Sequence, residues 1–222
     1  MKQFLQQSWT NSELLVIDDS PSNQRVRVAG PRVKVIYPNE RMSLGAKHNL
    51  GLELAQSEIL SHWDDDDWQA PRRLIHQVEA LALGKADICG YATDLLMTTG
   101  DAKFWRFDRT FIPTTEYVGN SMTKVGVPFM DGTAMWWRKL VGDIRYPDIA
   151  VSQKVKFLYD VWKMRNARVL RLPNDGMYIY VRHSNASSAH NTWQYMRDRR
   201  LLAVNRPPWF SDEDMEFYRN AV

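Results

Sequence analysis

Four consecutive aspartates, Asp64 to Asp67, are the residues whose type and spacing most plainly suggest chemistry. They follow residues 59–63, which are predicted to form a buried strand. Ligands bind at the carboxyl ends of strands in α/β sheets, and carboxylates packed this closely repel one another unless a cation neutralises them. Carboxylate oxygens suit Mg²⁺ or Mn²⁺. Because alternate residues can project the same way, we expect Asp64 and Asp66 to share one ion, with substrate phosphates and water completing its shell.

A structural explanation competes with the metal hypothesis for part of this run. Pro71 suits the first turn of a helix. An aspartate shortly before a helix can accept hydrogen bonds from its free N–H groups and complement its dipole. That role would account for Asp67 but not for four aspartates in succession.

The elements that must position these carboxylates can be predicted from hydrophobic spacing. Strands and helices alternate through the first 92 residues, which predicts an α/β domain with a mixed, mainly parallel sheet and helices on both faces. Residues 94–130 show hairpin-like or irregular patterns. The predicted strands cover 13–17, 33–37, 59–63, 87–92, 133–137, 169–172 and 177–181, and the predicted helices cover 1–9, 43–55, 71–81, 153–165 and the region from 192, broken at Pro207-Pro208.

Composition excludes several classes of protein. Of 222 residues, 44% are hydrophobic and 25% charged, which argues against a disordered chain. The net charge of +3 is too small for a dedicated nucleic-acid binder. Cys89 is the one cysteine, so neither an internal disulfide nor a thiolate metal cluster can form.

The chain carries no apolar run of about 18 residues and no basic-then-apolar leader pattern. We therefore expect a cytoplasmic protein. The basic residues Arg197, Arg199 and Arg200 leave peripheral association with the inner membrane face open. A solvated helix face is the favoured interpretation of them.

Several blocks, met in a fixed order, resemble the family 2 glycosyltransferases of the GT-A fold. The likeness covers most of residues 1–193, and its most specific part is the aspartate block in its context. It suggests a nucleotide-binding half (1–92), an acceptor-binding half (93–193) and a C-terminal helical extension (194–222). The blocks are LLVIDDS (14–20), GAKHNLG (45–51), ILSHWDDDDW (59–68), PRRLIHQ (71–77), GTAMWWR (132–138), and YVRH (180–183) followed by NTW (191–193).

This resemblance implies metal-dependent, inverting transfer of a sugar from a nucleotide-diphosphate donor, expected to be a UDP-sugar. The acceptor would be a saccharide, lipid-linked or protein hydroxyl, and the cation Mn²⁺ or Mg²⁺. The implied donor-binding residues are Asp18, Asp19, Lys47 and Asp65, and the implied metal ligands are Asp64, Asp66 and, if its strand returns to the site, His183. Each of these residues also has a structural explanation without a ligand. Aspartates can end a strand as turn residues, and a helix lysine can simply be solvated. A lone histidine is more often structural.

Two features depart from the family pattern. Members usually begin with a strand of the type V-S-V-I-I-P-T-Y-N, whereas Met1 stands in what resembles the following helix. A start further upstream is the favoured explanation, and replacement of the strand or degeneracy of the protein are the others. Members also place Glu-Asp, with the Asp as catalytic base, where residues 151–154 read VSQK. Gln153 stands at the base position and cannot accept a proton at neutral pH, so Asp148, and after it Asp131, are the candidate substitutes.

Other functions stay open at this point. The chain could be a degenerate domain that binds nucleotide and metal without turnover. It could be another metal-dependent nucleotidyl or phosphoryl enzyme, although no second carboxylate set for two metals is evident. It could also be an interaction module that uses its basic C-terminal region.

Overall fold

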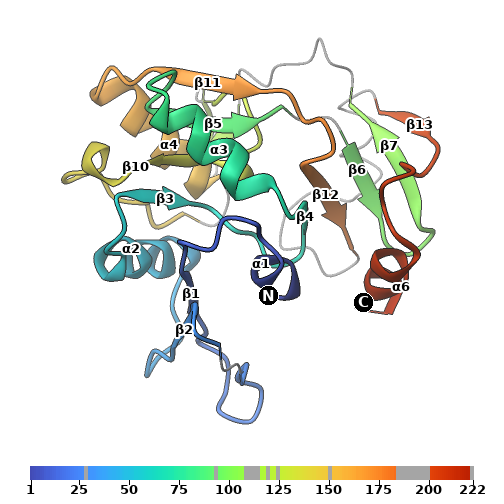
Figure 1. Ribbon diagram of the computed structural model, residues 1–222. Coiled ribbons are helices and arrows are strands. Elements are labelled where there is room, and N and C mark those ends of the chain that lie inside the picture. The colour runs from blue at the N-terminus through green and yellow to red at the C-terminus, as the bar shows by residue number, and fades with distance from the viewer. Residues whose placement is uncertain are drawn as a thin grey trace.

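The computed structural model describes residues 1–27, 30–92, 95–107, 116–118, 121–123, 126–149, 152–183 and 201–220 (Figure 1). Most predicted elements are present, with shorter bounds. In chain order they are α1 Lys2–Leu5, β1 Leu14–Ile17, β2 Val33–Ile36, α2 Leu44–Leu54, β3 Ile59–Ser61, β4 Trp68–Gln69, α3 Arg73–Ala82, β5 Ile88–Tyr91, β6 Leu95–Thr98, β7 Lys103–Arg106, β8 Glu116–Val118, β9 Ser121–Thr123, η1 Asp131–Thr133, β10 Met135–Trp137, η2 Arg138–Leu140, α4 Gln153–Met164, β11 Val169–Leu172, β12 Tyr178–Arg182, β13 Leu202–Val204 and α6 Asp212–Asn220.

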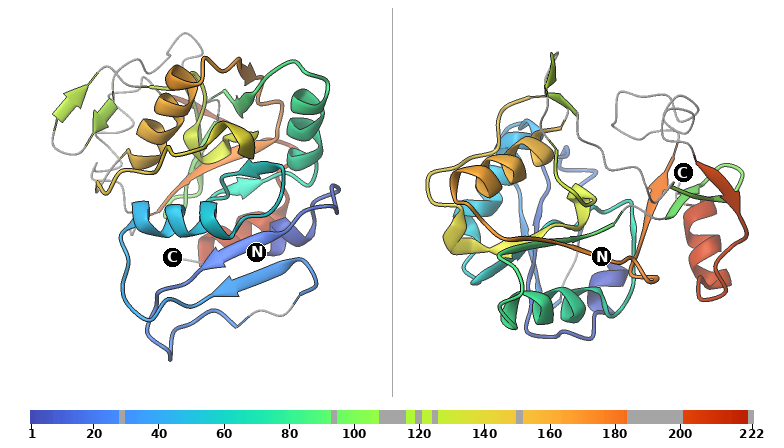
Figure 2. Two further views of the ribbon diagram at one scale, coloured as in Figure 1. Left: turned by 90° about the vertical axis from the view of Figure 1, so that its left-hand side faces the viewer. Right: turned by 90° about the horizontal axis from the view of Figure 1, so that it is seen from above.

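The central sheet has the strand order β11-β5-β10-β3 and lies between two helices. β5 runs parallel to β11 and antiparallel to β10. Alternate residues of a strand face opposite sides of a sheet. Thus Cys89 and Met135 pack in the cluster that includes α3, whereas Ile88 and Trp136 pack in the cluster that includes α4. Figure 2 (right) shows the two helices on opposite sides of these strands. The predicted mixed α/β fold with helices on both faces is confirmed. The central sheet is mainly antiparallel and not mainly parallel as predicted, because β10 pairs antiparallel with both β3 and β5.

The first two strands stand apart from this sheet. β1 and β2 form a parallel pair, with Leu14 opposite Val33 and Ile17 opposite Ile36. In Figure 1 they extend below the central sheet, beside α2. Within the described ranges β1 pairs with β2 alone and β3 with β10 alone, so no strand lies between β1 and β3.

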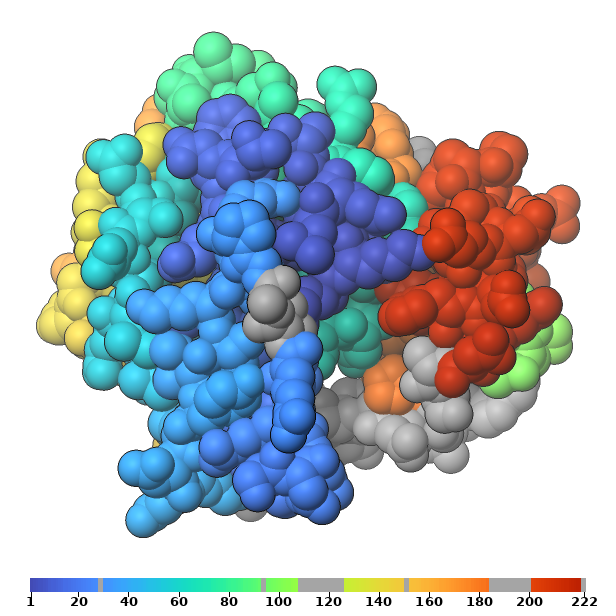
Figure 3. Space-filling view, turned by 60° about the horizontal axis from the view of Figure 1, so that its bottom comes forward, coloured from blue at the N-terminus to red at the C-terminus, as the bar shows by residue number. Residues whose placement is uncertain are grey.

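A second sheet, of order β13-β7-β6-β12-β4, carries its own core. Side chains from four of its strands pack with Phe210 and with α6. The two ends of the chain meet here (Figure 3), because Lys2 pairs with Glu213 and Gln3 Nε2 donates to the Tyr218 hydroxyl at 2.9 Å. None of the described helices is long and apolar enough to cross a bilayer.

The predicted helical C-terminal region is wrong in part. Residues 202–204 form β13, because their backbone pairs with β7 from Leu202 opposite Arg106 to Val204 opposite Phe104. α6 begins only after Pro207-Pro208, where the Ser211 hydroxyl accepts from the Asp214 N–H at 3.0 Å and caps it. Residues 192–200 lie outside the described part of the chain.

Two glycines of α2 make a matched test of its packing. A Cβ at Gly45 would lie 2.4 Å from the Pro147 carbonyl oxygen, whereas a Cβ at Gly51 would lie 3.6 Å from Ile17 Cδ1. We expect Gly45→Ala to lower the free energy of unfolding by about 1–3 kcal/mol, the usual cost of overpacking. Gly51→Ala should be neutral or stabilise by up to about 1 kcal/mol, because alanine favours helix. Urea unfolding compares the variants, and equal stabilities would contradict the close approach of α2 to Pro147.

Candidate functional site

The aspartate run forms the turn that leads from β3 to β4, at the carboxyl end of β3, as the sequence predicts. Its four side chains have different surroundings. Asp65 is exposed and Asp67 is buried, whereas Asp64 and Asp66 are half-buried. The run is therefore four distinct positions and not one uniform acidic surface.

Asp67 joins this turn to β12. Its Oδ1 accepts from the Val181 N–H at 2.8 Å, and its Oδ2 accepts from the Tyr178 hydroxyl. Burial, and then the neighbouring aspartates, raise the pKa of this carboxyl well above its usual range. Asp67 does not cap α3, whose N-cap is Arg72 without a side-chain cap. The predicted capping role is thus wrong, since β12 takes both carboxyl oxygens.

Asp66 lies beside His183, at the end of the same strand β12. Its Oδ2 is 3.2 Å from His183 Nε2, and the two side chains are 42% and 23% exposed. Burial and then the charge of Asp64 raise the pKa of Asp66, so a cation at its carboxylate would relieve an unfavourable charge. The predicted role of His183 required its strand to return to the aspartates, and β12 does return to them.

Asp64 faces the other way, toward the start of α4. Lys154 Nζ donates to both Asp64 carboxylate oxygens at 2.7 Å and lies 3.9 Å from Asp131 Oδ2. These carboxylates raise the pKa of Lys154 against the effect of its burial, so the ammonium stays charged. A Cβ at Gly132 would lie 2.2 Å from Asp64 Oδ2, so the contact requires glycine there.

Arg73 holds the two chain segments that carry these carboxylates. It is fully buried, and its guanidinium donates to the His62 carbonyl at 2.8 Å and the Gly132 carbonyl at 3.5 Å. It also lies over the Trp63 ring, 5.1 Å from the centroid. The residues before Asp64 and after Asp131 are thereby fixed to one side chain. Arg73 was expected in a helix, but its role in holding these two segments together was not predicted from the sequence.

Behind Asp131, two histidines and a tyrosine pack together. His62 Nδ1 lies 2.7 Å from the Asp131 carbonyl oxygen, which can only accept, so Nδ1 carries the proton. His62 Nε2 then accepts from the Tyr146 hydroxyl at 2.6 Å. His48 stacks on the Tyr146 ring with centroids 4.7 Å apart. This arrangement fixes the backbone that presents Asp131.

The lowered pKa of the half-buried His48 predicts a loss of stability in acid. Burial and then the charge of Lys154 lower the pKa of His48 from 6.5 to about 4. The unfolded chain therefore binds more protons between these values, and the free energy of unfolding should fall as the pH drops through that window. His48→Phe and His48→Gln should both lose less stability than the wild type between pH 7.5 and 5.0 in urea unfolding. An unchanged pH slope in both variants would contradict the lowered pKa of His48.

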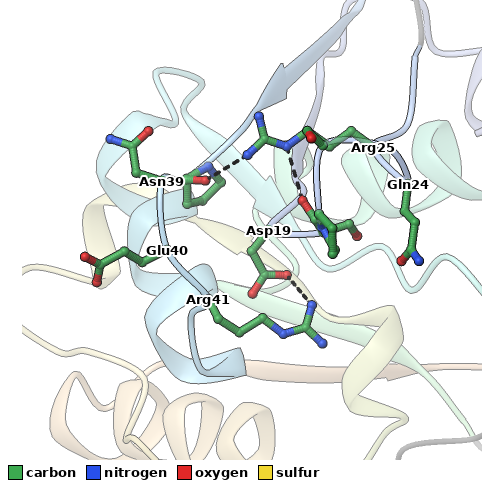
Figure 4. A pocket seen from close by; sticks show the side chains of 10 residues that line it. Asp19, Gln24, Arg25, Asn39, Glu40 and Arg41 are labelled. Atoms are coloured by element: carbon green, nitrogen blue, oxygen red, sulfur yellow. Dashed lines mark hydrogen bonds and ion pairs between the residues drawn. The ribbon is translucent and has the colours of Figure 1, made fainter.

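The loops that follow β1 and β2 enclose an open cavity of about 590 Å³, shown in Figure 4. Asp19 lies on its wall, where its carboxylate accepts from the Met42 N–H at 2.9 Å and pairs with Lys47 at 3.0 Å and Arg41 at 3.6 Å. The structure thus brings the predicted donor residues Asp19 and Lys47 together. Asp18 is engaged within its own loop, where its carboxylate accepts from the Ser20 and Val26 N–H groups at 3.0 and 2.8 Å.

α2 connects this cavity with the aspartate turn. Lys47 pairs with Asp19, and the charges of Lys154 and Asp64 act on the neighbouring His48.

The two residues considered for the position of the catalytic base, Gln153 and Asp148, differ in their burial. Gln153 is the first residue of α4 and is 6% exposed. Asp148 is exposed, and its backbone packs against Gly45 at the start of α2.

The chain is similar to glycosyltransferases in both sequence and fold. Residues 1–145 match the sequence family described as glycosyl transferase family 2. An uncharacterized glycosyltransferase of Haemophilus influenzae is 24% identical over 163 residues, which are 69% of this chain and 62% of that protein. The chain thus spans less than two thirds of the length of this relative.

Solved structures share the fold at low identity. S. aureus TarS 1-349 in complex with UDP-GlcNAc is 17% identical with a TM-score of 0.59, over 86% of this chain and 56% of that one. The mannosyltransferase PcManGT from Pyrobaculum calidifontis, in complex with GDP-Man and Mn²⁺, is 15% identical with a TM-score of 0.57, over 98% of this chain and 63% of that one. Both likenesses identify the GT-A arrangement.

Proposed function

Because the chain belongs to glycosyl transferase family 2, we propose that it transfers a sugar from a nucleoside-diphosphate donor to an acceptor hydroxyl, with a divalent cation at the aspartate turn. One observation carries this proposal. The fold brings Asp66 and His183, which are 117 residues apart in the sequence, to within 3.2 Å at the carboxyl end of β3. A carboxylate and an imidazole at a strand end are chemically suited to a cation that also contacts phosphate.

Asp66 and His183 are the residues that would hold the ion. Across the described ranges no group of three or more His, Cys, Asp or Glu side chains is arranged to hold one. Two protein ligands nevertheless suffice for Mg²⁺ or Mn²⁺ when diphosphate oxygens and waters fill the other positions. When bound, the cation would stabilise the charge that develops on the departing diphosphate. Asp64 can join only if Lys154 leaves it, and the exposed Asp65 can support the site from outside.

The donor nucleoside is proposed to occupy the cavity beside Asp19. A carboxylate there can accept from a base N–H or a ribose hydroxyl, and Lys47 can balance the charge of the diphosphate. UDP is the favoured nucleotide, supported by the TarS complexes with UDP and UDP-GlcNAc. GDP is the alternative suggested by PcManGT. Asp18 then acts by shaping the loop and not by contacting the donor.

An inverting, in-line displacement needs a group that takes the acceptor proton. The position predicted for that base holds Gln153, and the next residue is the charged Lys154. This observation favours a second candidate function, a domain that binds nucleotide and metal without turnover. Release of nucleotide from a nucleotide-sugar separates the two functions.

Thermal unfolding with UDP or GDP, in Mn²⁺ or in EDTA, tests the proposal. At a nucleotide concentration of 100 times Kd, binding stabilises by about 2.7 kcal/mol, which raises Tm by roughly 5–10 °C for a chain of this size. We expect that rise with UDP and Mn²⁺ and little change in EDTA. ADP serves as the control nucleotide. No shift with either UDP or GDP in Mn²⁺ would exclude a nucleotide-binding function.

A further inference from the structure

The carboxylates around the aspartate turn differ in how far their oxygens are already used. Lys154 contacts both oxygens of Asp64, and β12 takes both oxygens of Asp67. Asp66 faces His183 and is assigned to the cation. Asp65 is exposed and is assigned to support the cation site. None of these four is free to receive a proton from an acceptor hydroxyl beside the diphosphate.

Asp131 is the carboxylate of this cluster that remains. Its side chain is 29% exposed, and its nearest ionic contact is Lys154 Nζ at 3.9 Å, beyond hydrogen-bond distance. The hydrogen bonds that its carboxylate accepts come from the backbone N–H groups of Asp131 and Gly132. Its backbone is held firmly, because the carbonyl accepts from His62 and from the Ala134 N–H at 3.2 Å. A partly exposed carboxylate on a fixed backbone is suited to accept a proton from a hydroxyl that binds beside it.

We propose that Asp131 is the general base of the transfer, with Lys154 as the positioning residue that stands between it and Asp64. This inference rests on the proposed function. Lys154 comes from the start of α4, where a carboxylate base was expected. The site therefore contains one carboxylate that can act as the base. That carboxylate is carried by η1, whereas the family pattern places the base on α4.

The charged and titratable groups that face Asp131 support this role. They are Lys154 from α4, Asp64 from the β3–β4 turn, Tyr146 from the loop before α4 and Tyr180 from β12. Burial raises the pKa of Asp131, Lys154 opposes that rise, and Asp64 adds to it. The raised pKa makes this carboxylate a stronger base than an exposed aspartate. Asp64 bound to Lys154 has a lowered pKa and is the weaker base.

The step balances with an acceptor hydroxyl as the only co-reactant beyond the donor. The acceptor oxygen forms a bond to the anomeric carbon while its proton passes to Asp131. The bond between that carbon and the diphosphate oxygen breaks, and its electron pair leaves with the nucleoside diphosphate. Protonated Asp131 then releases its proton to water.

The test is release of nucleotide from UDP-GlcNAc, UDP-glucose or GDP-mannose by the full chain in Mn²⁺, with water or a sugar hydroxyl as acceptor. Asp131→Asn should lower kcat by about 10²–10⁴-fold, while nucleotide affinity, measured by calorimetry, changes less than about twofold. Asp131→Ala should regain activity in added formate, which a purely structural role would not allow. The acidic limb of the kcat–pH profile should also be absent from Asp131→Asn.

Two further variants sharpen the result. Asp143→Asn changes an exposed aspartate that pairs with Arg165 at 2.6 Å and should leave kcat unchanged. Asp148→Asn tests the rival base. Loss of kcat in Asp148→Asn with normal turnover in Asp131→Asn would overturn the proposal and leave the proposed function standing. Wild-type protein that binds UDP or GDP but releases nucleotide from none of the three donors would overturn it in favour of the binding-only function, and absence of nucleotide binding would instead refute the proposed function itself.

Discussion

Asp66→Asn is expected to lower nucleotide-sugar turnover by about 10²–10³-fold and to abolish the extra stability that Mn²⁺ gives in the presence of UDP. The size follows from losing a preorganised charge opposite the departing diphosphate. Asparagine keeps the shape of the side chain and can still hydrogen-bond to His183, so folding should be preserved. The pKa of Asp66 is raised by burial and by Asp64, and removing its charge without metal should not destabilise the protein.

Turnover assays and thermal unfolding in Mn²⁺ and in EDTA measure these effects. Asp160→Asn is the matched control, because Asp160 pairs with Lys156 along α4 and takes no part in the proposed site. His183→Gln should show the same pattern as Asp66→Asn to a smaller degree. If Asp66→Asn retained full Mn²⁺-dependent stabilisation by UDP, the cation would have to lie elsewhere.

Lys154→Met should lower the free energy of unfolding by about 3 kcal/mol. Removing one partner of a buried ion pair leaves an uncompensated charge, which typically costs 3–5 kcal/mol. The lower end applies here because the Lys154 and Asp64 side chains keep 16% and 27% of their exposure. Methionine retains most of the apolar stem, so the loss reports charge more than packing. Urea unfolding at pH 7.5 in EDTA measures it.

A double variant isolates the charge effect. Asp64→Asn in the Lys154→Met background removes the stranded carboxylate and should restore about half or more of the lost stability, since coupled neighbours are not additive. Additive losses in the double variant would mean that Lys154 stabilises α4 by packing and not through Asp64.

Several parts of the fold can be predicted from the sequence because they depend on local patterns. The four residues of β5 are all buried, as expected of a strand covered on both faces. Leu74, Gln77 and Leu81 lie on one side of α3 at the spacing that predicts an amphipathic helix. The position of the aspartates at a strand end could likewise be predicted, since the strand predicted over 59–63 stops directly before them.

The distant pairings that complete the site could not be predicted in the same way. Asp67 reaches Tyr178 and Val181, and Asp64 reaches Lys154, over 90 residues or more. No local pattern encodes such contacts. β4 is only two residues long and exists because it pairs with β12, and β13 depends on β7 in the same way.

One signal for Lys154 was present in the sequence. At the place where the family carries Glu-Asp, residues 151–154 read VSQK, with Lys154 directly after the base position at Gln153. We considered this only as the loss of a base. A basic residue there, directed at a run of four aspartates, also predicts an ion pair, and the structure contains that pair. The predicted base Asp148 is exposed beside α2.

The most direct measurement is pulsed electron paramagnetic resonance of Mn²⁺ bound to the protein with UDP. We expect nitrogen modulation from His183 together with phosphorus coupling from the diphosphate, and loss of the nitrogen signal alone in His183→Gln. Two results would contradict this expectation: phosphorus coupling without nitrogen modulation in the wild type, or nitrogen modulation that persists in His183→Gln. Either result would show that the cation bound to the diphosphate is not held by the end of β12.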